Sequence, residues 1–377
     1  MNVTLKSIRE KTWLEENRMK SSETDNPPII DCHVHFTDVE SEGRILEIMG
    51  KAPLTRMNLL STLDAVKLNF NPELIYMKRL HPHLFYTFGA LEYPARIYQG
   101  TNLDLKRIER TSLPEQVDEL IDIGFDGIKM IESHAMWRKH VGPLNSKHYK
   151  EYFKRAESLQ FPILFHGNAT GLSRRSTDTG PRSYDRTQYP LWVRDSGWYH
   201  PLLKKARLEL ADVFEHCPNL KVIFAHFGSL AYAPPEQTPE ILDRYKNMNL
   251  DVTPGMMMYN WTQRRDEWRE IFLKYQDRIL FGTDVFSSNR LDVAVDLIQR
   301  VRRFLETEEP ITWGFQPRRE PTIGFNLPRH VLRKIYAENF ERIVGKNPGE
   351  LNTEAAIAKC QRMEKMMREA GPWPYSV

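Results

Sequence analysis

Short apolar runs alternate with longer amphipathic stretches along most of this chain. The apolar runs predict strands at 28–36, 57–62, 84–92, 125–131, 161–167, 221–228, 249–255 and 278–285. Between several of them, apolar and charged residues recur with a period near 3.6, which predicts helices at 114–123, 146–160 and 265–276. Strands that alternate with helices pair in parallel, and eight such units predict an α/β fold of the (β/α)8 TIM-barrel type.

The two ends of the chain differ from this alternating region. The first residues are polar and charged, and an Asn-Pro-Pro stretch interrupts regular structure just before the first strand. The segment from about residue 327 has a helical pattern, and we expect it to pack outside the barrel. We therefore predict a polar N-terminal arm, itself one helix, followed by a barrel and a helical tail, at 1–28, 29–345 and 346–377.

Composition indicates one large soluble protein with no preference for nucleic acid. Of the 377 residues, 41% are hydrophobic, which suffices for a large core, and single α/β barrels reach this length. The formal net charge of +3 is nearly balanced, and no basic run is dense enough to predict a nucleic-acid-binding tract.

The same sequence predicts a cytoplasmic location. The charged N-terminus lacks the apolar centre of a signal peptide, and no apolar stretch approaches the ~18 residues that a membrane-spanning helix needs. Cys32, Cys217 and Cys360 lie far apart and form no Cys-x-x-Cys pair. Such sparse cysteines are typical of a reducing compartment and not of a disulfide framework.

Several predicted strands carry polar residues where they end. The first ends in His33 and His35, and later strands end in His166, His226 and Asp284. Alternate side chains on a strand face the same way, so we expect His33 and His35 to point together into the barrel mouth, with Asp31 below them. Four imidazoles and a carboxylate converging at the carboxyl ends predict a site for a divalent ion such as Zn²⁺.

The histidine spacing alone does not establish this site, because His81 and His83 have the same spacing. That pair precedes the run at 84–92 and therefore lies at the amino end of a strand. Residues at that end of a barrel serve stability, so we interpret His81 and His83 as structural.

The order of these residues resembles that of the amidohydrolase superfamily. The matching segments are "IIDCHVHF", "GFDGIKM", "FPILFHGN", "KVIFAHFG", "ILFGTDV" and "IYAENFERIVG", which span residues 29–345. More narrowly, the chain resembles the amidohydrolase-related branch that includes aminocarboxymuconate-semialdehyde decarboxylase and resorcylate-type decarboxylases. Decarboxylases of this branch often carry Glu in the first-strand motif, whereas this chain reads "DCHVHFTD".

The resemblance implies roles for individual residues. It implies that His33, His35, His166 and Asp284 bind one divalent ion, with Zn²⁺ as the first expectation and Mn²⁺ as the alternative. It also implies that His226 is a nearby acid or base. A bound ion lowers the pKa of water to ~7, and Asp284 can accept the proton of that water.

Lys129, at the end of the fourth strand, leaves two interpretations open. In binuclear amidohydrolases a lysine here is carboxylated and bridges two metals, in which case His166 and His226 would bind the second one. Alternatively, Lys129 pairs with Glu132 or Glu92, or it contacts an anionic substrate. We prefer this alternative to the metal bridge.

Two connections are candidate pocket walls. The long stretch at 171–200 is rich in Arg and Asp, and Arg forks bind carboxylates and phosphates. The second wall, at 253–268, carries methionines and aromatic residues. The substrate contacts that we expect are Lys129, Arg174, Arg175, Arg194 and Trp261. Alternatively, the charges of the first loop pair with one another in solvent and the second wall is ordinary packing.

Three functions follow from this site. The first is hydrolysis of an ester, lactone or amide of a small anionic substrate by a metal-activated water, with His226 and Asp284 as the catalytic residues. The second is non-oxidative decarboxylation of an aromatic or muconate-like acid at the same site. The third is a barrel without activity that serves as a binding subunit, against which the intact five-residue set argues. The sequence favours hydrolysis and leaves a homo-oligomer open.

Overall fold

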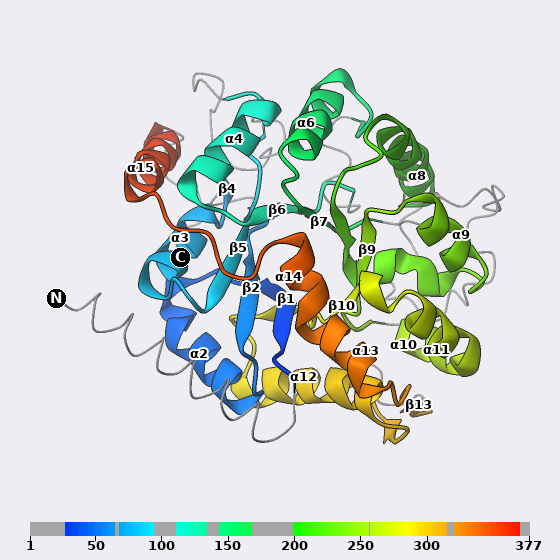
Figure 1. The fold of residues 1–377 in the computed structure, drawn as a ribbon. Coiled ribbons are helices and arrows are strands. Elements are labelled where there is room, and N and C mark those ends of the chain that lie inside the picture. The colour runs from blue at the N-terminus through cyan, green and yellow to red at the C-terminus, as the bar shows by residue number, and fades with distance from the viewer. Residues whose placement is uncertain are drawn as a thin grey trace.

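The structure, a computed structural model, describes residues 27–64, 68–93, 111–133, 143–167, 199–255, 257–314 and 320–369, with the backbone alone at 199–207 and 369. Nine strands form one sheet in which all neighbours are parallel, in the order β10-β9-β8-β7-β6-β5-β2-β1-β11 (Figure 1). Their bounds are β1 Ile30–His35, β2 Arg56–Leu60, β5 Phe85–Gly89, β6 Gly127–Met130, β7 Ile163–Phe165, β8 Val222–Phe224, β9 Met248–Asp251, β10 Ile279–Leu280 and β11 Val285–Phe286.

The sheet closes into a barrel through the segment that joins its two edge strands. β10 pairs with β9, and β11 pairs with β1, although only a few residues separate β10 from β11. Between them, Cys32 N donates to Phe281 O at 3.0 Å, and Asp284 N donates to His33 O at 2.8 Å. The predicted eighth strand at 278–285 is therefore present but split, because Asp284 adopts a left-handed backbone (φ 61°) that interrupts the ladder. Together with the other seven predicted strands, this confirms the (β/α)8 barrel.

Helices surround the ring of strands (Figure 1). The three helices predicted from periodicity are confirmed as α4 Leu113–Ile123, α6 Lys147–Ser158 and α11 Arg265–Lys274. The others are α2 Glu42–Lys51, α3 Asn71–Leu80, α8 Tyr199–His216, α9 Gln237–Arg244, α10 Met257–Gln263, α12 Leu291–Glu306, α13 Arg329–Arg333, α14 Asn339–Ile343 and α15 Thr353–Glu369. Short 3-10 turns lie at η1 Val39–Ser41, η6 Ala225–Tyr232 and η7 Gln276–Arg278, and η8 Lys334–Glu338 is a π-helix. Two short antiparallel pairs were not predicted: β3 Leu63–Asp64 with β4 Leu68–Asn69, and β12 Pro310–Ile311 with β13 Thr322–Ile323.

Local sequence signals determine both ends of α4. Ser112 and Glu115 form a capping box, in which Glu115 Oε2 accepts from Ser112 N at 2.7 Å and Ser112 Oγ accepts from Glu115 N. The helix ends at Gly124, whose φ of +100° is left-handed. A Cβ at this position would also lie 2.0 Å from Glu350 O, so the close approach of the C-terminal segment requires glycine here.

The strands divide the core into an inner and an outer layer. One cluster contains side chains that point into the barrel, among them Cys32, Tyr86, Phe88, Leu164 and Ile223. The larger cluster contains the opposite faces of the strands and the helices that cover them. The inner face of the strands also holds buried Asn58 and Asn249, which are opposite Tyr86 and Ile223 in the neighbouring strands.

The helical segment after residue 327 closes the amino-terminal opening of this barrel. Ala337, Phe340 and Ile343 belong to the inner cluster, and the Phe340 ring lies 4.9 Å from that of Tyr86. Asn339 Nδ2 donates to Ile279 O at 2.7 Å. We expected this segment to pack outside the barrel. Instead, α14 crosses the centre of the ring in Figure 1.

Helix α15 packs on α3 and α4, and a buried lysine of α15 pairs with two glutamates. Lys359 Nζ lies 2.5 Å from Glu92 Oε1 and 2.8 Å from Glu119 Oε2. No helix in the described parts of the chain is both long and apolar enough to cross a membrane. The division into arm, barrel and tail stays a prediction, and the arm up to residue 26 lies outside the described residues.

Candidate metal centre and active site

A β-bulge in β1 turns His33 and His35 into the barrel. Asp31 is opposite Met57 but Val34 is opposite Leu59, so β1 carries one extra residue between these pairs. Strict alternation had placed Asp31 on the same face as the two histidines. That expectation is wrong, because Ile30 and Cys32 occupy the inner layer below the bulge.

Asp31 contacts Thr283 and not the two histidine side chains. Its Oδ2 accepts from the hydroxyl of Thr283 at 2.5 Å, and burial raises its pKa to about 7. The carboxyl group therefore holds the segment before Asp284 against β1.

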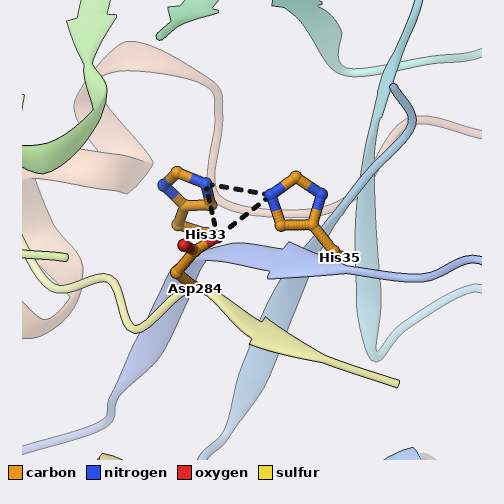
Figure 2. Close-up of side chains that lie close together, drawn as sticks. All are labelled: His33, His35 and Asp284. Atoms are coloured by element: carbon orange, nitrogen blue, oxygen red, sulfur yellow. Dashed lines mark hydrogen bonds and ion pairs between the residues drawn. The ribbon is translucent and has the colours of Figure 1, made fainter. Parts of the chain in front are cut away.

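His33, His35 and Asp284 bring three donor atoms together. His33 Nε2 lies 3.2 Å from His35 Nε2 and 3.3 Å from Asp284 Oδ1, and His35 Nε2 lies 3.1 Å from the same oxygen (Figure 2). Ligands held ~2.0–2.2 Å from one ion at tetrahedral angles lie ~3.3–3.6 Å apart, and at octahedral angles ~2.8–3.1 Å. The observed separations run from the upper end of the octahedral range to the lower end of the tetrahedral range, so the three residues fit a divalent ion.

The charge states of these groups also suit a cation. Burial, and next the charge of Lys129, lower the pKa of His33 to about 4, and burial lowers that of His35. For Asp284, partial burial acts to raise the pKa, but the surrounding imidazoles outweigh it and hold the pKa well below its usual range. Two neutral imidazoles and one carboxylate are a donor set that Zn²⁺ and similar ions accept.

Asp251, at the end of β9, was not identified from the sequence. Its Oδ2 lies 2.8 Å from His33 Nδ1, and its Oδ1 accepts from His226 N at 2.8 Å and from Thr253 N at 3.1 Å. Burial acts to raise its pKa, but His33 outweighs this and lowers it. An ionised Asp251 accepts the Nδ1 proton of His33 and leaves Nε2 unprotonated, with a lone pair that can bind a metal. The sequence did contain a signal for this residue, namely a carboxylate within the predicted strand at 249–255, in "NLDV".

Close approach of two strands supports this arrangement. Gly282 faces Thr253 and His33, and a Cβ on it would lie 2.9 Å from Thr253 Oγ1 and 3.2 Å from His33 Cβ. Thr253 Oγ1 itself lies 3.1 Å from His33 Nδ1. A larger residue at 282 would displace both contacts of the His33 ring.

Asp284 and His226 both sit on left-handed backbone. Asp284 has φ 61°, and His226 begins a run of four left-handed residues that ends at Ser229. Such conformations cost about 1–3 kcal/mol each in non-glycine residues and cluster at functional sites. They aim His226 Nε2 at Asp284 Oδ2, 3.9 Å away.

His166 lies beside this group but not within it. Its ring centroid is 4.8 Å from that of His226, and it is half-buried at the end of β7. The three-residue donor group does not include His166, so its role as a ligand stays a prediction.

Lys129 points at the donor group. Its buried Nζ lies 3.0 Å from His33 Nε2, and burial lowers its pKa to about 8. The alternative pairing with Glu92 is wrong, because Glu92 pairs with Lys359. Glu132 turns to Tyr93, whose hydroxyl donates to its Oε1 at 2.6 Å.

The expected substrate contacts on the loops are placed differently. Trp261 is fully buried, with its ring centroid 5.0 Å from Phe227 and 5.3 Å from Phe272. This packing position argues against the predicted substrate contact. Arg174, Arg175 and Arg194 lie outside the described residues. His81, interpreted as structural, pairs with Glu42 at 2.7 Å just before β5, as expected.

Comparison with known proteins gives one family. A family model described as amidohydrolase matches residues 30–348, whereas no curated protein matches the chain. A solved structure from Staphylococcus aureus, described as an amidohydrolase, is 17% identical and covers 84% of this chain and 99% of its own, with a TM-score of 0.51. A 2,6-dihydroxybenzoate decarboxylase solved with 2,6-dihydroxybenzoate is 16% identical and covers 84% and 98%, with a TM-score of 0.50. At these identities the likeness is one of fold.

Proposed function

The chain belongs to the amidohydrolase family and is an enzyme for a small-molecule substrate, and we propose that it hydrolyses an ester, lactone or amide bond. We propose that His33, His35 and Asp284 hold one divalent ion, with zinc preferred over manganese, and that His166 completes the set. When bound, the ion supplies Lewis-acid chemistry, polarising a carbonyl and lowering the pKa of water.

The observation that supports hydrolysis is the position of the Asp284 carboxylate. Oδ1 lies 3.1 Å from His35 Nε2 at the donor group, whereas Oδ2 faces His226 Nε2 at 3.9 Å. The same carboxylate can therefore bind the ion and accept a proton from the attacking water. Water activation needs such a proton acceptor.

The remaining steps use residues of this chain. The water oxygen adds to the carbonyl carbon, and its proton moves to Asp284. The bond to the leaving oxygen or nitrogen then breaks, and that atom takes the proton from Asp284, either directly or relayed through His226. Asp251 accepts from the backbone N–H of His226 and so holds this residue beside Asp284, where its ring can orient the substrate.

We propose that the substrate is anionic. Buried Lys129 beside the donor group and the arginines in the sequence of 171–200 support this proposal, because both can pair with a substrate anion. The sequence also supports our proposals of a cytoplasmic location and of no nucleic-acid partner, and it leaves a homo-oligomer open.

Decarboxylation is the second candidate, and Lys129 is the observation that favours it. A buried ammonium 3.0 Å from His33 Nε2 can pair with a substrate carboxylate. The carbon–carbon bond would break to release CO2, and His226 would protonate the carbon that the carboxylate leaves.

A substrate panel with metal-loaded protein tests these alternatives. Lactones, esters and anilides are followed by acid release, and hydroxybenzoates by CO2 release, with Asp284→Asn as the matched inactive control. We expect acid release without CO2. The reverse result would replace hydrolysis by decarboxylation. A protein that binds metal but turns over neither class, on broad panels, would favour the third function, a binding subunit.

A further inference from the structure

The two histidines of β1 are held in different ways. His33 Nδ1 has two partners, Asp251 Oδ2 at 2.8 Å and Thr253 Oγ1 at 3.1 Å. His35 Nδ1 is buried and has no hydrogen-bond partner among the described residues. A buried polar atom without a partner leaves the imidazole without the contact that normally orients a metal-binding histidine.

A phenylalanine ring covers His35 instead. The ring centroids of His35 and Phe286 lie 4.5 Å apart, and the ring planes differ by 14°. The two residues are directly opposite in the parallel pairing of β1 with β11. Ser287 N donates to His35 O at 2.8 Å, which fixes the backbone positions of the pair.

β11 therefore brings two different groups to the same site. Asp284, immediately before this strand, supplies a carboxylate oxygen to the donor group, and Phe286 supplies the stacked ring. The short strand couples the position of the His35 ring to that of the Asp284 carboxylate.

We infer that Phe286 is the positioning residue for His35: its stacked ring sets the imidazole plane so that Nε2 faces the donor group. This inference rests on the proposed metal site. Without the Phe286 ring, the His35 ring can tilt out of the plane that the donor group requires, because no hydrogen bond restrains Nδ1. Loss of an orienting partner typically lowers metal affinity by about 10–100-fold, and we expect the lower end here.

The test is a double-mutant cycle on metal affinity. Phe286→Ala, His35→Ala and the double variant are titrated with zinc against a competing chelator. Phe286 is 38% exposed, so its truncation should leave the fold intact. Tyr76→Ala, which removes an equally exposed ring from α3, is the matched control.

We expect Phe286→Ala to weaken zinc binding about tenfold and to have no effect once His35 is absent. Phe286→Tyr should restore affinity, since it keeps the ring. Unchanged affinity in Phe286→Ala, or an equal loss with and without His35, would overturn the inference.

A second measurement tests the role of Phe286 without relying on metal binding. In metal-free protein, ¹⁵N-detected NMR of the His35 ring reports its order and tautomer. We expect Phe286→Ala to broaden or shift the His35 ring signals and leave those of His33 in place. Unaltered His35 signals would contradict the role of Phe286, whether or not the wild type binds zinc. Absence of zinc binding in the wild type would separately contradict the proposed function.

Discussion

Asp251 Oδ2 lies 2.8 Å from Nδ1 of His33, although 218 positions separate the two residues along the chain. The contact joins the seventh strand of the barrel to the first. It determines which nitrogen of His33 carries the proton, and so which nitrogen can bind a metal.

Asp251→Asn should weaken metal binding about 10–100-fold. The amide keeps the shape of the carboxylate, but its NH₂ group can donate to His33 Nδ1 and so favour the tautomer with the proton on Nε2. Chelator competition measures the affinity. Asp266→Asn, at a side chain that is 92% exposed, is the control. Equal affinity in both variants would show that Asp251 does not orient His33.

Metal stoichiometry distinguishes a mononuclear from a binuclear centre. We expect about one zinc or manganese ion per chain by elemental mass spectrometry, lost in His33→Ala and Asp284→Asn. Lys129→Met should keep that ion without loss of affinity, because it removes a positive charge 3.0 Å from a ligand atom.

About two ions per chain, with the second lost in Lys129→Met, would instead establish a carboxylated Lys129 bridge. No metal after growth with added zinc would remove the metal site altogether.

Trp261→Ala should destabilise the protein by about 3–5 kcal/mol, because it leaves a cavity in an aromatic cluster. Urea unfolding measures the loss. Trp261→Phe should cost less and leave KM unchanged. A rise in KM for Trp261→Phe at unchanged stability would restore Trp261 as a substrate contact.

Glu132 should make stability fall as pH rises. Burial raises its pKa from 4.5 to about 7 in the folded protein. Between these values the folded state keeps a proton that the unfolded state has lost. The free energy of unfolding is therefore unaffected by Glu132 ionisation below pH 4.5, and it falls until about pH 7.

Relative to Glu132→Gln, the wild type should therefore lose about 3 kcal/mol of unfolding free energy between pH 4.5 and pH 7. Urea titrations at several pH values measure the difference, with exposed Glu270→Gln as the control. A constant difference across this range would contradict a protonated Glu132.

Local pattern was sufficient for the barrel and for most of the residues at its mouth. Apolar runs with period two and helices with period 3.6 determine which segments become strands and helices, and alternation of the two determines parallel pairing. Because parallel strands all end at one rim, His33, His166, His226 and Asp284 could be assigned to that rim from their sequence positions alone.

The tertiary structure decided what depends on contacts between distant segments. The bulge in β1 reversed the expected side of Asp31, and packing took Trp261 into the core. Asp251 and Phe286 became part of the site only because β9 and β11 lie beside other elements that no local pattern specifies. Periodicity reports which face of a strand is buried. Hydrogen bonds and ring contacts depend on ångström-scale distances between strands, and only the closed barrel determines these.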